Sequence, residues 1–171
     1  AKLLRRLSRG ADSESLGAWY SPGEPAQPVV LLFHGNGGRR STVQSQAEWL
    51  ARRGNGVLLV TLRAHGDSSG DYNDVGYSSR LDVLAAVDWS HERDPDRIRV
   101  VWGQSVGGAA AVLAAADAGE RVNAYILECV FSDLKQAVWN RLQLYLPPVL
   151  DRVAYAGLLV VSPVFVPHLN D

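Results

Sequence analysis

The stretch "IRVVWGQSVGGAAAVLAA", residues 98–115, decides how this chain is interpreted. It begins with an apolar run typical of a buried strand and ends with small residues typical of a helix. Between them, Gly103, Ser105 and Gly107 form the pattern GxSxG. A serine on a tight strand-to-helix turn adopts a strained backbone conformation, and glycines on either side leave room for neighbouring backbone. We therefore predict a sharp turn at Ser105 that presents its hydroxyl above a sheet.

The rest of the chain alternates strand-length apolar runs with helix-length segments. This pattern predicts an α/β fold, a mostly parallel sheet with helices on both faces. The expected strands are residues 15–22, 28–35, 56–63, 98–103 and 122–130. The expected helices are residues 41–54, residues 77–92, the segment after Ser105, and residues 132–145.

Two of these helices have a predicted start, end or inner face. Ser41 is expected to cap the first helix and Gly54 to stop it. The expected inner residues are Val43, Ala47, Leu50 and Ala51 in the first helix, and Leu81, Leu84, Ala85 and Trp89 in the second.

Composition limits the classes of function. The 171 residues are 47% hydrophobic and 20% charged with a net charge of −1, which fits one domain over residues 1–171 and gives no reason to expect nucleic acid binding. The single Cys129 cannot form an internal disulfide, so a reducing, cytoplasmic compartment is favoured. The histidines and Cys129 show no metal-ligand spacing, and we expect no metal or organic cofactor.

A second glycine-rich segment, "FHGNGG" at residues 33–38, follows an earlier strand. It can present the amide of Asn36 toward the same point as the Val106 amide, which lies free at the start of the helix after Ser105. Two such donors can bind an oxyanion. A phosphate loop is the alternative, but Arg40 and Ser41 stand where that motif needs Gly and Lys.

Four segments taken together resemble the α/β-hydrolase superfamily: "LLFHGNGG", "LRAHGDSSG", "WGQSVGG" and "YILECVFSD", within residues 15–133. The resemblance implies that Ser105 is an acyl nucleophile and that the Asn36 and Val106 amides form the oxyanion hole. It also implies small-molecule ester, thioester or amide substrates. Ala64 stands where the family has glycine after the arginine, a change we expect to matter little.

Such a serine needs a base oriented by an acid, and in this fold the chain order is serine, acid, histidine. The only later histidine is His168, a weakly supported candidate base, whereas Glu128 ends a predicted strand and is a candidate acid or substrate contact. Asp133 is expected to cap the next helix. We expect the chain to be C-terminally truncated, without the strands that carry the triad's acid and base.

The three earlier histidines have structural interpretations. We expect His34 to belong to the oxyanion loop, His65 to a turn and His91 to a solvated helix end. None of them is predicted to be the base.

Residues 146–171 are predicted to be a lid or a connector to further strands. The apolar residues 158–166 are expected to be buried in a core completed by further strands rather than to form an apolar lid or contact a membrane. The chain contains no methionine, even at position 1, which predicts a fragment or a processed product. A non-catalytic ligand-binding module on the same fold is the alternative function.

Overall fold

Five strands form the central sheet, in the order β3-β5-β4-β6-β7. The computed structural model describes residues 7–8 and 14–165. Strand β3 is antiparallel to β5, and the other neighbours are parallel. The strands are β1 (Leu7–Ser8), β2 (Ser15–Leu16), β3 (Ala18–Ser21), β4 (Val29–Phe33), β5 (Gly56–Val60), β6 (Arg99–Gln104) and β7 (Ala124–Glu128), of which β1 and β2 form a separate pair.

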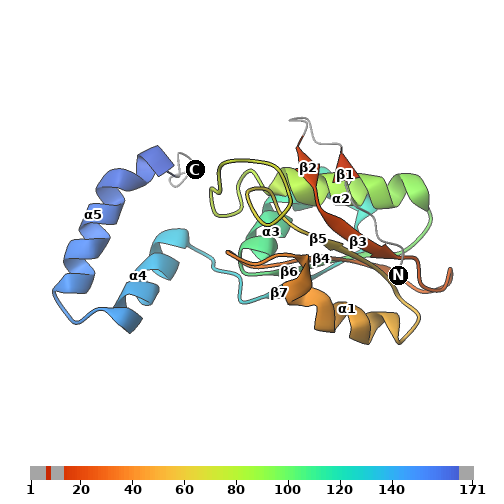
Figure 1. Cartoon of the computed structure of the whole chain (residues 1–171), viewed down its shortest axis with the longest axis horizontal. Coiled ribbons are helices and arrows are strands. Elements are labelled where there is room, and N and C mark those ends of the chain that lie inside the picture. Colours follow the sequence, from red (N-terminus) through yellow and green to blue (C-terminus); the bar gives the residue numbers. More distant parts are fainter. Residues whose placement is uncertain (1–6, 9–13, 166–171) are drawn as a thin grey trace. The chain divides into compact units, whose positions relative to one another are not determined.

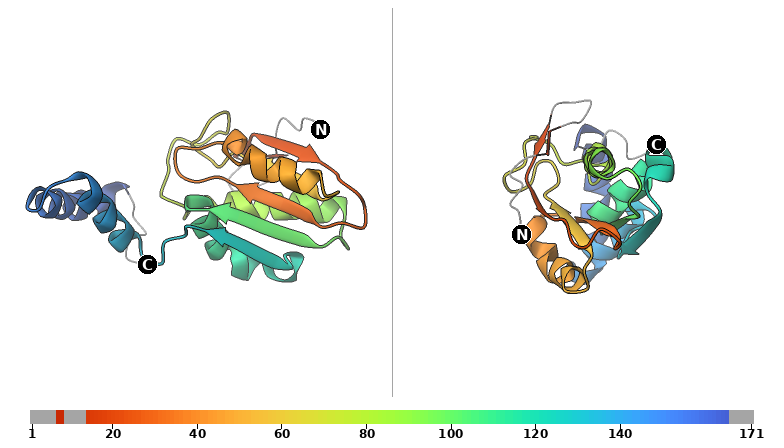
Figure 2. Two further views of the ribbon diagram at one scale, coloured as in Figure 1. Left: turned by 90° about the horizontal axis from the view of Figure 1, so that it is seen from below. Right: turned by 90° about the vertical axis from the view of Figure 1, so that its right-hand side faces the viewer.

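Helices cover both faces of this sheet (Figures 1 and 2). Helix α1 (Gln44–Ala51), entered through the 3₁₀ turn η1 (Arg40–Val43), lies on one face. Helices α2 (Arg80–Arg93) and α3 (Val106–Ala118) pack together on the other, and the 3₁₀ turn η2 (Gly119–Arg121) follows α3. The predicted fold class, a mostly parallel sheet between helices, is confirmed.

Strands β4 and β5 form the centre of the core because both faces are covered. All five residues of each strand are buried, as expected for continuous apolar runs in a parallel sheet. On the α1 face, seven buried residues form one cluster: Val30, Leu32, Val43, Ala47, Leu50, Val57 and Leu59. The core therefore fixes the carboxyl ends of β4, β5 and β6, where the loops of interest begin.

The predicted start of the first helix was wrong. Ser41 lies within the 3₁₀ turn, and no side chain caps α1 at Val43. Arg40 explains the difference, because its backbone N–H and its guanidinium both donate to Thr61 and its guanidinium stacks on Trp19. Ala51, predicted to face inward, is exposed.

The predicted inner face of the second helix was also wrong in part. Ala85 is buried, but Leu81, Leu84 and Trp89 are only half-buried. The other buried positions of α2 are Asp82, Val83, Ala86, Val87 and Ser90. Asp82 forms a buried ion pair with Arg63 after β5, and this contact sets which side of the helix faces the core.

The contacts divide the chain into two compact units, Ala1–Val130 and Phe131–Asp171. The second unit contains α4 (Leu134–Tyr145) and α5 (Leu150–Phe165), with Trp139 and Tyr155 packed edge to face at 5.0 Å. Asp133 caps α4, as predicted, by accepting the N–H groups of Lys135 and Gln136. Residues 146–171 as a lid or connector remain a prediction.

Strand β7 is one of the two outer strands of the described sheet, and β3 is the other. Strand β7 pairs only with β6 among the described strands, and its Ile126 and Leu127 are 40% and 45% exposed. The predicted exposed edge near Cys129 is confirmed, and Cys129 itself is exposed. No helix among the described residues is long and apolar enough to cross a membrane.

Candidate active site

The predicted sharp turn at Ser105 is confirmed. The residue has φ 50° and ψ −113° and lies between the last residue of β6 and the first of α3. Few non-glycine residues adopt such angles, so the surrounding hydrogen bonds must impose them. The Ser105 N–H donates to the Glu128 carbonyl at 2.8 Å, and its own carbonyl accepts the Ala109 N–H at 2.9 Å.

The glycines beside this turn are required by close backbone contacts. A Cβ on Gly103 would lie 2.5 Å from the Gly107 carbonyl oxygen, and one on Gly107 would lie 2.6 Å from the His34 carbonyl oxygen. Neither position has space for a side chain. A Cβ on Gly35 would lie 3.4 Å from the Ser105 Cβ, so the glycine-rich loop after β4 is adjacent to the serine.

The loop of residues 34–38, which we call the oxyanion loop, turns tightly after β4. The Gly38 N–H donates to the Gly35 carbonyl at 3.1 Å, and Gly37 has φ 69°, a conformation that favours glycine. The Asn36 side chain accepts a hydrogen bond from the Asn73 amide at 2.7 Å. The loop is therefore fixed from outside as well as by its own turn.

Two backbone donors belong to residues next to this contact in the chain: Val106 follows Ser105, and Asn36 follows Gly35, whose Cβ position lies 3.4 Å from the Ser105 Cβ. Within the described residues, the N–H groups of Asn36 and Val106 have no acceptor in the protein. The Val106 N–H is at the start of α3, where the positive end of the helix dipole lies. The Ser105 hydroxyl is half-buried and has no hydrogen-bond partner in the same part of the chain. This arrangement suits a substrate carbonyl that becomes negatively charged.

His34 is fully buried and serves as a structural member of the loop. Its Nε2 accepts the Leu62 N–H at 3.0 Å, so the ring proton is on Nδ1, which donates to the Gly35 carbonyl at 2.7 Å. Burial lowers the pKa of His34 to about 4. Both ring nitrogens are engaged, which excludes His34 as a base in this arrangement.

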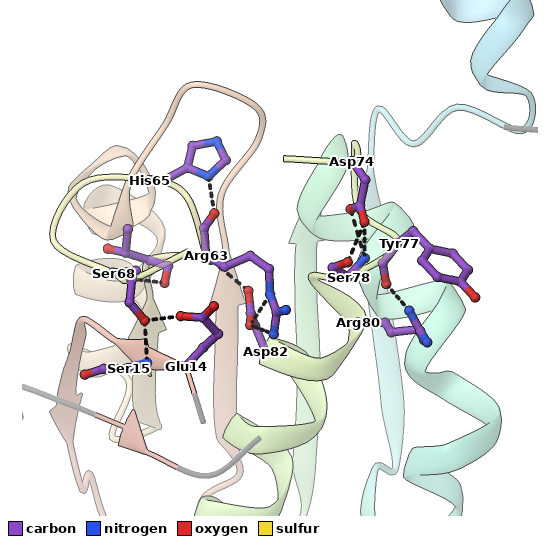
Figure 3. Close-up of polar contacts among 12 residues, drawn as sticks. Glu14, Ser15, Arg63, His65, Ser68, Asp74, Tyr77, Ser78, Arg80 and Asp82 are labelled. Atoms are coloured by element: carbon purple, nitrogen blue, oxygen red, sulfur yellow. Dashed lines mark hydrogen bonds and ion pairs between the residues drawn. The ribbon is translucent and has the colours of Figure 1, made fainter. Parts of the chain in front are cut away.

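His65 has a contact that sequence reasoning missed. Its Nδ1 donates to the Arg63 carbonyl at 2.7 Å, shown in Figure 3, and its Nε2 accepts the Gly37 N–H at 3.2 Å. The sequence placed it only in a turn. Its position two residues after Arg63 gives no local signal, because the partner Gly37 is 28 residues away.

Beneath this turn, Arg63 and Asp82 form the buried ion pair shown in Figure 3. Asp82 accepts the Arg63 backbone N–H at 2.8 Å and its guanidinium at 2.8 and 2.9 Å. The pair connects α2 to the loop after β5. Ala64, the next residue, has φ 56°, which explains why glycine suits this position.

A further loop, residues 70–79, approaches the site from the start of α2. Asp74 accepts the Ser78 N–H through both carboxylate oxygens, at 2.9 and 3.0 Å, and stabilises the turn that leads into the helix (Figure 3). In the same loop, Asn73 donates to Asn36 and accepts the Val75 N–H. The loop thus contributes directly to the position of Asn36.

The other candidate residues have mixed outcomes. Glu128 ends β7 next to Gln104, and its carbonyl fixes Ser105, while the role of its half-buried carboxylate remains a prediction. His168 lies outside the described residues. His91 was predicted to be solvated, which is wrong: it is half-buried and lines a cavity of about 360 Å³ with Arg97 and Arg99.

That cavity is far from Ser105. Arg99 begins β6 and Ser105 follows its end, so the six residues of the strand separate them by about 20 Å. Among the described residues, no group of three or more His, Cys, Asp or Glu side chains is arranged to hold a metal ion.

Comparisons with known proteins agree with this architecture. The family described as "Serine aminopeptidase, S33" matches residues 24–165. The quorum-quenching protein AidA of Acinetobacter baumannii is 36% identical over 64% of this chain and 38% of its own length. The lysophosphatidylserine lipase ABHD12 of Danio rerio is 29% identical over 77% of this chain and 34% of its own length.

The fold is shared with solved esterases. The esterase Pf2001 of Pyrococcus furiosus superposes with a TM-score of 0.75 at 23% identity, covering 95% of this chain and 60% of that one. Est1E of Butyrivibrio proteoclasticus, solved with ferulic acid, gives 0.61 at 24% identity, covering 70% and 50%. The chain belongs to the serine aminopeptidase S33 family of α/β-hydrolases. It spans little more than a third of the length of the curated relatives above.

Proposed function

We propose that this chain contributes the nucleophile and the oxyanion hole of a serine hydrolase that acts on ester-like substrates. Ser105 forms the acyl-enzyme, and the Asn36 and Val106 N–H groups bind the oxyanion. The observation that carries this proposal is the strained Ser105, at φ 50°, beside two backbone donors without acceptors in the described part of the protein. Relatives named as a lipase and an esterase support ester substrates, and thioesters or amides remain proposals.

In the proposed reaction, the Ser105 Oγ attacks the substrate carbonyl carbon while a general base removes its proton. The carbonyl oxygen becomes an oxyanion, and the two N–H groups bind it. The leaving group then takes the proton, and water hydrolyses the acyl-enzyme by the same steps. Removing one such donor typically costs about 3–4 kcal/mol of transition-state stabilisation.

We do not assign the base to any of the three described histidines, His34, His65 and His91. His34 and His65 use both ring nitrogens in hydrogen bonds, and His91 lines a cavity at the opposite edge of the sheet. His168 as base and Glu128 as acid or substrate contact remain proposals. Without an engaged base, the oxyanion hole and binding alone accelerate hydrolysis by about 10³ over water.

A fluorophosphonate probe tests the proposal, because only an activated serine reacts quickly with it. The 171-residue chain and the longest reading frame that contains it are labelled in parallel, and the modified residue is identified by mass spectrometry. We expect rapid labelling of Ser105 in the longer protein, lost in Ser105→Ala and retained in the control Ser41→Ala. Folded protein without labelling would instead favour a non-catalytic binding module, and labelling that is the same in Ser105→Ala would place the nucleophile at another residue.

A further inference from the structure

Two histidines contact successive peptide planes of the oxyanion loop. His34 donates from Nδ1 to the Gly35 carbonyl oxygen at 2.7 Å. That oxygen belongs to the same planar peptide unit as the Asn36 N–H, and in a trans peptide the two groups point in opposite directions. A hydrogen bond that fixes the Gly35 carbonyl therefore fixes the direction of the Asn36 N–H.

His65 acts on the next peptide unit. Its Nε2 accepts the Gly37 N–H at 3.2 Å, and this N–H shares its plane with the Asn36 carbonyl. Its Nδ1 is itself fixed by the Arg63 carbonyl, and Arg63 is fixed by Asp82 (Figure 3). The two planes that flank Asn36 are thus each attached to an imidazole.

We propose that His34 and His65 are positioning residues for the oxyanion hole, a histidine clamp that aims the Asn36 N–H only while both rings are neutral and carry their proton on Nδ1. Each ring accepts a backbone N–H at Nε2 and donates at Nδ1. A proton added to either Nε2 removes its acceptor and turns that hydrogen bond into a repulsion between two donors. At His65 the loop then loses its Gly37 contact with the ring, and at His34 the ring loses the Leu62 N–H that orients its Nδ1 toward the Gly35 carbonyl.

Burial lowers the pKa of His34 and so favours the neutral form of that ring. The ring centroids are 5.1 Å apart, so two imidazolium charges would repel each other. Two arginines on neighbouring segments are paired with carboxylates, Arg63 with Asp82 of α2 and Arg40 of η1 with Asp67. Within the described residues, neither imidazole has a carboxylate hydrogen-bond partner.

The clamp makes the oxyanion hole depend on pH, and this consequence rests on the proposed function. An oxyanion hole that requires two neutral histidines weakens as the pH falls, separately from any protonation of the catalytic base. NMR measures the hydrogen bonds of the loop directly, whereas Ser105 labelling tests the proposed function. The failure of one is therefore distinguishable from the failure of the other.

The experiment uses the ¹⁵N-labelled 171-residue chain. We expect the His65 ring at pH 8 to show a protonated Nδ1 and a bare Nε2, and the Gly37 amide resonance to shift on acidification with the same midpoint as the His65 ring. A protonated Nε2 at pH 8, or a Gly37 amide that does not follow that ring, would overturn the clamp. This titration needs no variant to fold.

Variants separate positioning from mere packing. Loss of one hydrogen bond predicts that His65→Leu speeds amide hydrogen exchange at Gly37 by about tenfold. His65→Gln should retain most of the protection, because its side-chain oxygen can accept in place of Nε2. His91→Gln is the control, since His91 lies at the other edge of the sheet, and should leave Gly37 unchanged. Equal exchange in the Leu and Gln variants would contradict the proposal.

Discussion

At the residue scale, the feature that matters most is the backbone of Ser105. A serine at φ 50° and ψ −113° stores strain of about 1–3 kcal/mol, which the rest of the fold must overcome. The sequence predicted this turn correctly, because GxSxG between a strand and a helix has a specific steric cause. It did not reveal that the Glu128 carbonyl fixes the turn, since that contact comes from a neighbouring strand.

Replacing the strained serine with glycine should stabilise the protein. Glycine adopts positive φ freely, and after its greater unfolded-state entropy is subtracted the gain is about 1 kcal/mol. We expect Ser105→Gly to raise the free energy of unfolding in urea and to abolish labelling at this position. Ser41→Gly, in the 3₁₀ turn, is the matched control and should not stabilise. A less stable Ser105→Gly protein would argue against strain.

His34 should make the stability depend on pH. Its pKa is about 4 in the folded protein and 6.5 as the ordinary value, so the unfolded chain binds more protons between these values. Stability is therefore complete above about pH 6.5 and falls as the pH approaches 4. From pH 7.5 to 5 the expected loss is about 2 kcal/mol.

Urea unfolding of the wild-type chain and His34→Gln at both pH values measures this contribution. The variant should lose about 2 kcal/mol less between the two pH values than the wild type. His91→Gln should keep the wild-type pH dependence. An unchanged slope in His34→Gln would mean that the ring is not held neutral by burial.

At the element scale, the sequence predicted which elements form better than how they face the core. The apolar runs of β4 and β5 need no distant information, because continuous apolar residues suit a strand covered on both faces. The rotation of α2 was missed, since it depends on Asp82 meeting Arg63 across 19 positions. The start of α1 was missed for the same reason, as Arg40 bonds to Thr61.

The Arg63–Asp82 pair should therefore be much more important than a surface pair. Removing one partner of a buried pair leaves a buried charge and costs about 3–5 kcal/mol, whereas surface pairs contribute about 0–1 kcal/mol. Asp82 is 1% exposed. Asp88, on the same helix, pairs with Arg121 and is 42% exposed. We expect Asp82→Asn to lower stability far more than Asp88→Asn in urea titrations. Similar losses would contradict the role given to α2.

At the scale of the whole molecule, the site is assembled from segments far apart in sequence. The oxyanion loop, the turn after β5, loop 70–79 and the start of α3 meet at the carboxyl edge of the sheet, where open α/β sheets bind ligands. The GxSxG motif and the glycine-rich loop allowed the sequence to predict a site at this edge of the sheet. The histidine contacts and the Asn73 contact did not, because they arise only once the strands are in register.

The open edge at β7 should promote self-association. Unpaired strand backbone next to exposed Ile126 and Leu127 is a template for pairing with another chain. We expect sedimentation to show concentration-dependent association that Ile126→Lys reduces. Ile98→Lys alters an isoleucine outside the strands that is 53% exposed, against 40% for Ile126, and should change little. Association that is equal in both variants would place the contact elsewhere.

The most direct test of the central claim is a crystal structure of the chain phosphonylated at Ser105. The phosphonyl oxygen stands in for the oxyanion of the acyl-transfer intermediate. The account predicts that this oxygen lies about 2.7–3.1 Å from both the Asn36 and the Val106 backbone nitrogens. An adduct whose oxygen points to solvent, away from both amides, would contradict it.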